Sequence, residues 1–291
     1  MDIVVGFTGS LGGQDALSLG ALLARSGSAN MDVYMILNKD KPYALAAPEG
    51  GYDKMLREQA AEWIEDAEEE LGLDDLVCHL HYAAHPADGL LEVCEKKHPA
   101  CLIISGGRHG ALGKVTLGSI GTSLIHSSPV PLALAPRGMR HRKIKKINRI
   151  TACVGTLEGT ERLLRSTVVA AREMDCDVRV LSLIELPVPG AKKEALISHK
   201  QAVQQLEKNL AYIKDNLPDD LHVTTEVAKG TSISDAVERI DWKEDEIVLL
   251  GSARLGAPTR LFLGNVANKI LRAVPVPLII VPRHDEDEVS T

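Results

Sequence analysis

The feature that most constrains this chain is an internal repeat. Residues 105–137 (SGGRHGALGKVTLGSIGTSLIHSSPVPLALAPR) align without a gap to residues 251–283 (GSARLGAPTRLFLGNVANKILRAVPVPLIIVPR), at an offset of 146 residues. Because the same pattern occurs twice, each half is expected to form the same structural unit. We therefore predict two domains of ordinary size, over residues 1–140 and 147–285. The recurring positions are Arg108, Gly110, Ala111, Leu117, Gly118, Pro129, Val130, Pro131, Leu132, Pro136 and Arg137 in the first half.

Each half alternates between short apolar runs and amphipathic helical stripes. Continuous apolar runs separated by such helices predict parallel strands that are covered on both faces and joined by right-handed crossovers. The fold class expected is α/β, with two tandem three-layer α/β/α domains that each hold a five-stranded parallel sheet. The runs are 3–5, 33–37, 77–83, 101–104 and 132–135, then 150–154, 178–184, 221–227, 247–250 and 278–281. The clearest helical stripes are Leu56, Ala60, Ile64, Ala67 and Leu71, and Val203, Leu206, Leu210, Ile213 and Leu217.

Composition and charge exclude several classes of protein. The 291 residues carry a formal net charge of -7, so no overall basic field favours nonspecific binding of nucleic acid. No run of 18 apolar residues occurs, so we expect no membrane span. The chain opens with the strand-like MDIVVGF and shows no basic, apolar leader, which predicts a cytoplasmic protein.

The cysteines and nearby histidines predict neither disulfides nor a metal site. The five cysteines are odd in number and scattered, as reduced core thiols are. Cys78-His79-Leu80-His81 resembles a ligand cluster, but alternation along a strand would place Cys78 and Leu80 on one face and both histidines on the other. We therefore expect no metal here.

A basic segment, GMRHRKIKK over residues 138–146, joins the two halves. It could contact an acidic partner or nucleic acid. Because it is short and holds no aromatic residue for stacking on bases, a solvated linker is the preferred interpretation. The chain ends in the acidic, unpatterned HDEDEVST.

A glycine-rich stretch, GGRHGALGKVTLGS over residues 106–119, follows the fourth strand. In doubly wound sheets, ligands bind beyond the carboxyl ends of the strands. Glycines let backbone N–H groups approach an anion, which a helix N-terminus helps to hold. Ser119 is placed to cap the next helix or to donate its hydroxyl to a phosphate, and Lys114 could reach a phosphate as a point charge. The alternative is that these glycines serve only tight turns.

The tandem halves, the glycine loop and the closing segments SSPVPLALAPR and AVPVPLIIVPR resemble the universal stress protein family over nearly the whole chain. The resemblance implies an adenine nucleotide alpha hydrolase-like fold with strand order 3-2-1-4-5. Many members bind ATP through G-x2-G-x9-G-(S/T), with Mg²⁺ accompanying ATP only, and others bind no nucleotide. Members commonly pair through the fifth strand, as homodimers or between tandem halves. The Val-Pro-Leu segments 130–132 and 276–278 fit that edge role.

Carried onto this sequence, the motif implies an adenine nucleotide site in the first half. The implied phosphate contacts are Gly107, Gly110, Gly118 and Ser119, with Lys114 or Arg108 nearby and the base near Thr8 and Leu37. The corresponding positions in the second half are Gly256, Gly264 and Asn265.

The sequence departs from the ATP-binding pattern in three places. Seven residues separate Gly110 from Gly118 where the pattern has nine, and the second half shares this short spacing. In the second half, Ala253 replaces the first glycine and the closing Gly-Ser becomes Gly264-Asn265. No acid follows the first strand of either half, where the stretches are FTGS and VGT. The first half is therefore the better candidate.

Two other functions compete with nucleotide binding. The stretch LGGQDA over residues 11–16 resembles the S-G-G-x-D-S pyrophosphate loop of adenylating enzymes, but both serines are absent. The other rival is a nucleotide-free platform for an unknown protein partner, although 3% aromatic residues argue against a large aromatic hot spot. We predict a stress-response binding or signalling module that is not an enzyme.

Overall fold

Ten strands of the chain form one continuous sheet with the order β3-β2-β1-β4-β5-β10-β9-β6-β7-β8. The structure, a computed structural model, describes residues 1–38, 51–71, 76–107, 111–155, 160–187, 190, 192–252 and 264–282. The first domain contains β1 (Asp2–Phe7), α1 (Leu11–Gly27), β2 (Asn30–Asn38), α2 (Gly51–Leu71), β3 (Cys78–Ala83), α3 (Pro86–Lys97), β4 (Cys101–Ser105), α4 (Ser119–Ser127) and β5 (Leu132–Ala135). The second contains β6 (Arg149–Cys153), α5 (Glu161–Met174), β7 (Asp177–Glu185), α6 (Lys193–Asp215), β8 (Val223–Gly230), α7 (Ile233–Glu238), β9 (Glu246–Gly251), α8 (Asn265–Ala273) and β10 (Leu278–Val281).

Each half has the strand order 3-2-1-4-5, and its five strands are parallel. All ten apolar runs predicted from the sequence form strands, with shifts of at most three residues at their ends. The central strands are apolar throughout because helices cover both faces, so every position of β5 and of β10 is buried. The predicted α/β class and strand order are confirmed.

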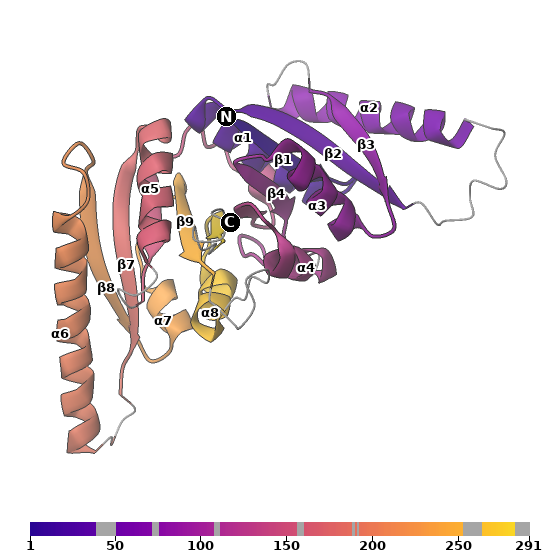
Figure 1. The fold of residues 1–291 in the computed structure, drawn as a ribbon. Helices are drawn as coiled ribbons and strands as arrows, with labels where there is room; N and C mark the ends of the chain where they lie inside the picture. Colours follow the sequence, from indigo (N-terminus) through magenta and orange to yellow (C-terminus); the bar gives the residue numbers. More distant parts are fainter. Residues whose placement is uncertain are drawn as a thin grey trace, which may run out of the picture.

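The helices form two layers, one on each face of the sheet. One face packs against α1, α2, α5 and α6, through residues such as Leu19, Ile64 and Leu210. The other face packs against α3, α4, α7 and α8, through residues such as Leu90, Leu124 and Ile270. Figure 1 shows the two domains side by side, with α6 along the outer edge next to β8.

The two domains join through their fifth strands, which pair antiparallel. Leu134 lies opposite Leu278, and Ala133 lies opposite Ile279. Pro131 and Pro277 precede these strands, and their carbonyl oxygens accept hydrogen bonds from strands of their own domains, at 2.8 and 2.9 Å. The pairing of the two halves implied by the family resemblance is the pairing observed.

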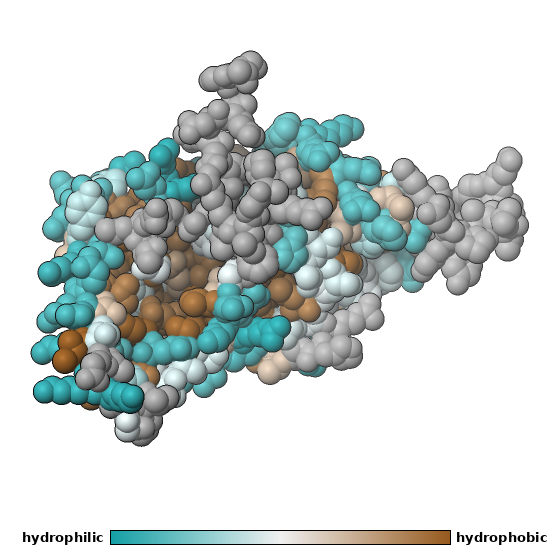
Figure 2. All heavy atoms as spheres, turned by 60° about the horizontal axis from the view of Figure 1, so that its bottom comes forward, coloured by the Kyte–Doolittle hydropathy of each residue, from teal (hydrophilic) through white to brown (hydrophobic). Residues whose placement is uncertain are grey.

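Four residues of the predicted stripe, Val203, Leu206, Leu210 and Ile213, belong to α6, which begins ten residues before the stripe, at Lys193. The fifth, Leu217, lies two residues beyond the end of α6 at Asp215. Val203, Leu210 and Ile213 are buried, whereas Leu196 in the early turns is 51% exposed. On the face seen in Figure 2, hydrophilic residues lie along the margins and hydrophobic residues gather between them. No helix in the described part of the chain is long and apolar enough to cross a membrane.

The segment that joins the domains differs from the solvated linker that its charges predict. It contains a short 3-10 helix, η2 (Met139–His141), after Gly138 at φ 85°. Met139 within the segment and Ile147 directly after it are 2% and 0% exposed, and both side chains pack into the core. The linker is therefore anchored to the body of the protein at both ends.

The strand β3 separates its cysteine and histidines as alternation predicts. Cys78 and Leu80 pack against one core, while the His79 ring lies 4.9 Å from that of Tyr34 and His81 contacts Glu92 at 2.7 Å. Within the described ranges, no three His, Cys, Asp or Glu side chains are grouped so that they could hold a metal ion.

Candidate functional site

A cleft of about 820 Å³ opens in domain 1 at the carboxyl ends of β1 and β4. The strand order reverses between these strands, which is where open α/β sheets bind ligands. The volume lies within the range of small-molecule sites, roughly 300–1,000 Å³. The lining residues come from six parts of the fold: the end of β1 with the β1–α1 turn, β2, the end of β4, the start of α4, the first half of α3 and the linker after β5.

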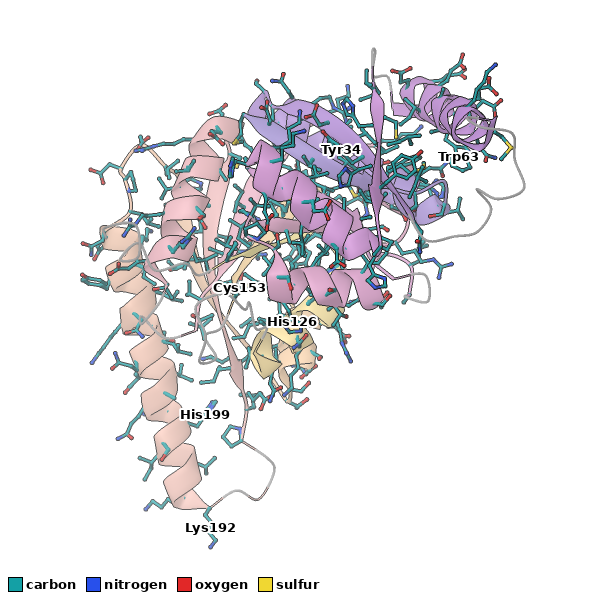
Figure 3. All side chains as sticks on the ribbon, turned by 45° about the vertical axis from the view of Figure 1, so that its right-hand side comes forward. Tyr34, Trp63, His126, Cys153, Lys192 and His199 are labelled. Atoms are coloured by element: carbon teal, nitrogen blue, oxygen red, sulfur yellow. The ribbon has the colours of Figure 1, made fainter. Side chains whose placement is uncertain are left out.

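The β1–α1 turn is held close to its neighbours by glycines. A Cβ on Gly13 would lie 1.8 Å from the carbonyl oxygen of Thr8, and one on Gly9 would lie 2.3 Å from the ring of Trp63. Trp63 comes from α2 (Figure 3) and packs edge-on against Phe7. Ser10 caps α1 by accepting from Gly13 N–H at 3.3 Å. Close packing therefore explains the diglycine that resembled a pyrophosphate loop.

The two legs of the glycine loop also bind each other. The Gly107 N–H donates to Thr116 O at 2.5 Å, and the Thr116 hydroxyl donates to Gly107 O at 2.9 Å. A Cβ on Gly107 would lie 3.0 Å from Gly118 N. Gly107 lines the cleft as expected, but its N–H group is already used, so its role here is close packing of the loop.

The start of α4 supplies the polar floor of the cleft. The sequence suggested Ser119 as a cap, but the N-cap is Gly118, and Ser119 is the first helical residue. The first turn of any helix leaves N–H groups without intrahelical acceptors, and here these belong to residues that line the cleft. A Cβ on Gly118 would meet only Gly107 Cα among the described atoms, at 3.7 Å, so a side chain has room to enter the cleft.

Two of the predicted contacts lie away from the cleft. Leu37 packs on the opposite face of the sheet, and Tyr34 and Ile36 line the cleft instead. The reason is that alternate residues of a strand point to opposite faces. The Lys114 ammonium donates to the carbonyl oxygen of Ala273 at the end of α8, so it is directed at domain 2.

The remaining predicted residues divide into those the cleft includes and those outside the described residues. Thr8, Gly107, Gly118 and Ser119 all line the cleft. Arg108, Gly110 and Gly256 lie outside the described residues.

Two cations that sequence reasoning did not assign to the site line the cleft. Arg137 follows β5, and Arg140 belongs to η2. Arg140 NH1 donates to Asp15 Oδ1 at 3.0 Å, and Asp15 is only 3% exposed. The basic composition of residues 138–146 was the available signal, but only the path of the linker brings it to the cleft.

In domain 2, the described residues around α7 and α8 make contacts of their own. Gly264 is the N-cap of α8 and Asn265 its first residue, as at the start of α4. Glu185 Oε1, at the end of β7, accepts from the Ile233 N–H at 3.2 Å and from the Lys269 ammonium at 3.1 Å. The bond from Lys269 holds the pKa of Glu185 below its usual value. A carboxylate of the protein thus already bridges α7 and α8.

A residue at the base of the cleft in domain 1 also differs from its counterpart in domain 2. Strand registers pair Gly6 with Tyr34 in domain 1 and Cys153 with Leu181 in domain 2, so Cys153 stands where the cleft has a glycine. Figure 3 shows Tyr34 in domain 1 and Cys153 in domain 2. Cys153 packs into the core of its domain. At this described position, domain 2 therefore carries a bulkier side chain than domain 1.

Comparisons with known proteins agree with this architecture. The family model described as "Universal stress protein family" matches residues 1–136 and 146–282. The universal stress protein Rv2319c of Mycobacterium tuberculosis is 28% identical over 293 residues, covering 97% of this chain and 100% of that protein. The universal stress protein Rv2005c of the same organism is 25% identical over 299 residues, covering 96% of each. A crystal structure of a universal stress protein from Archaeoglobus fulgidus matches 98% of this chain and 97% of its own, with 16% identity and a TM-score of 0.61.

Proposed function

The chain belongs to the universal stress protein family, and we propose that it is a cytoplasmic binding module of the stress response, which holds one adenine nucleotide in the cleft of domain 1. In this proposal the protein works by binding and not by catalytic turnover. The ligand is ATP or a smaller adenine nucleotide, and any Mg²⁺ would arrive on the phosphates of ATP.

The observation that carries the proposal is the division of the cleft into an apolar and a polar end. Tyr34, Ile36 and Leu90 supply apolar and aromatic surface against which a purine base could stack. The start of α4, with Arg137 and Arg140, supplies N–H groups and positive charge. A nucleotide has the same division, with an aromatic base at one end and phosphate at the other.

The proposal places a single nucleotide in each chain. In domain 2, the Glu185 carboxylate already accepts from the α7 N-terminus and from Lys269, and Cys153 replaces Gly6. A phosphate there would have to displace an ion pair and would meet a fixed negative charge.

The experiment is isothermal titration of the nucleotide-stripped protein with ATP and Mg²⁺, with AMP and cyclic AMP as comparison ligands. We expect binding at one site per chain with at least one of them. Absence of heat with every adenine nucleotide, in protein shown to be folded, would contradict the proposal and favour the nucleotide-free protein-interaction platform.

The site itself is tested by Gly118→Val. Gly118 has φ -87° and ψ -178°, an extended conformation that valine adopts readily, so the variant should fold. Its side chain would enter the cleft beside the first turn of α4, and we expect binding to fall at least tenfold. Gly264→Val is the matched control, since Gly264 caps α8 with φ -60° and ψ 162°. Equal affinity of the Gly118→Val variant and the wild type, measured by the same titration, would remove the site from domain 1.

A further inference from the structure

The linker after β5 turns back and places the side chain of Arg140 in the cleft. Gly138 has φ 85°, a conformation that favours glycine, and a Cβ there would also lie 2.7 Å from Leu112 Cδ1. The buried Met139 holds the following turn against the core. The side chain of Arg140 is only 14% exposed and lines the cleft.

Asp15, in the first turns of α1, fixes this arrangement. Its Oδ2 accepts from Gly138 N–H at 3.0 Å, and its Oδ1 accepts from Arg140 N–H and from Arg140 NH1, both at 3.0 Å. A buried carboxylate is costly unless it is paired and hydrogen-bonded, and this one receives three donors from a single short segment. The position of Arg140 therefore depends on Asp15.

The guanidinium of Arg140 has N–H groups that bind no described residue. NH1 serves Asp15 and, at 3.4 Å, the carbonyl oxygen of Leu11. No described residue accepts from Nε or NH2 of Arg140. Among the described residues, the charged side chains that line the cleft are Asp15, Arg137 and Arg140, which sum to a formal charge of +1. A planar guanidinium with unused N–H groups suits a phosphate oxygen better than a neutral ligand.

We propose that Arg140 selects the anionic group of the cleft ligand and that Asp15 is the residue that positions it. The inference rests on the proposed function, because it concerns the same cleft. It moves the cationic contact from the glycine loop to the interdomain linker. The ligand class becomes adenine compounds that carry phosphate, in preference to the bare nucleoside.

The test compares AMP with adenosine by titration calorimetry on the full-length protein. We expect Arg140→Gln to weaken AMP binding at least tenfold and adenosine binding less than twofold. Arg140→Lys retains the charge and the bond to Asp15, so it should recover part of the loss. Arg142→Gln is the matched control, since Arg142 lies on the same linker but donates to Pro275 O at 2.7 Å and does not line the cleft.

The role of Asp15 is tested by Asp15→Asn and by the double variant with Arg140→Gln. If Asp15 acts through Arg140, the single variant weakens AMP binding, and the double variant binds AMP no more weakly than Arg140→Gln alone. An Asp15→Asn variant with AMP affinity equal to or above that of the wild type would refute the positioning role.

Two results separate the failure of this inference from the failure of the proposed function. Wild-type protein that binds AMP, with Arg140→Gln and Arg140→Lys both unaffected, would overturn the inference alone. Wild-type protein that gives no heat with adenosine or with any adenine nucleotide would overturn both, and if ATP binds where AMP does not, ATP replaces AMP in the same comparison. Melting temperatures of all variants show whether a loss of binding merely follows a loss of folding. If Arg140→Gln does not fold, the AMP and adenosine affinities of Arg140→Lys are compared with those of the wild type instead.

Discussion

At the scale of single residues, burial controls the chemistry of the thiols. Desolvation raises the pKa of each of Cys94, Cys101 and Cys153 to about 12, and that of Cys78 and of Cys176 to about 11. A thiol with a pKa of about 12 is ionised in roughly one molecule in 10,000 at pH 8. Because the thiolate is the reactive form, these cysteines are core residues and poor nucleophiles.

We predict that the folded protein reacts slowly with a thiol reagent such as DTNB at pH 8, with less than one thiol per chain modified in the first minutes. In protein unfolded in guanidinium, all five cysteines should react with DTNB at once. Since the folded pKa values exceed the unfolded value of about 8.5, the protein should also lose stability as the pH rises above about 9. Rapid modification of a thiol in the native protein would contradict this assignment.

Individual side chains are also where sequence reasoning failed. Leu37 and Ile36 both lie in an apolar run, and a strand buried on both faces gives no alternation to tell which side faces the cleft. Lys114 was assigned to a phosphate from its place in the loop, but its acceptor, Ala273, is 159 residues away. A contact between residues so far apart in the sequence depends on how the two domains dock. The local sequence pattern around Lys114 does not contain that information.

At the scale of elements, the start of α7 shows how a short helix is fixed. Ser232 is its N-cap, and the Ser232 hydroxyl accepts from Asp235 N–H at 3.1 Å. Asp235 accepts in return from Thr231 N–H at 2.7 Å. Its bonds to Arg239 and Thr231 lower its pKa to about 2, so it stays ionised well into the acid range. The pattern is a variant of the capping box, in which the carboxylate at N3 accepts from the residue before the N-cap and not from the N-cap itself.

We predict that Ser232→Ala lowers the free energy of unfolding by about 1 kcal/mol, because an N-cap oxygen is lost while an N–H group remains unpaired. Urea denaturation followed by circular dichroism measures the change. Ser232→Asn keeps a capping oxygen and should stay within about 0.3 kcal/mol of the wild type. Equal loss in both variants would show that another feature of the serine matters.

The elements themselves were largely predictable, whereas their caps and the linker were less so. Ten apolar runs gave ten strands, because a buried parallel strand needs an unbroken apolar stretch. Ser119 was expected to cap α4 from its residue type, yet Gly118 occupies that position. The basic linker gave no helical period, so η2 and the buried Met139 had no clear local signal.

At the scale of the whole molecule, the duplication leads to a symmetric sheet. From one edge of the sheet to its centre, the strands of domain 1 follow the order 3-2-1-4-5, and from the centre to the other edge the strands of domain 2 follow the reverse order. Among the described strands, only β5 and β10 pair antiparallel. The recurring Pro-Val-Pro-Leu segments at 129–132 and 275–278 lie beside this junction. The cleft, with Asp15 and Arg140 in its lining, belongs to domain 1, so two halves with one fold differ in individual side chains such as Gly6 and Cys153.

Two cations hold the domains together next to that junction. Lys114 donates to Ala273 O in the last turn of α8, and Arg142 donates to Pro275 O at 2.7 Å just beyond it. The ends of helices present carbonyl oxygens without partners, which favour cations. Burial lowers the pKa of Arg142, so its charge is partly desolvated and depends on the carbonyl it binds.

We therefore predict that Arg142→Ala weakens domain docking and lowers the free energy of unfolding by about 1–2 kcal/mol, the usual loss for a hydrogen bond to a charged group. Amide exchange at β5 and β10 should rise more than exchange at β1 or β6, because the clamp lies beside the fifth strands. Lys146→Ala is the control, since Lys146 also donates to a helix-end carbonyl, Asp175 O at 3.0 Å, but is 42% exposed and should contribute less than about 0.5 kcal/mol. If Arg142→Ala left exchange at the fifth strands unchanged, the junction would depend on strand pairing and apolar packing alone.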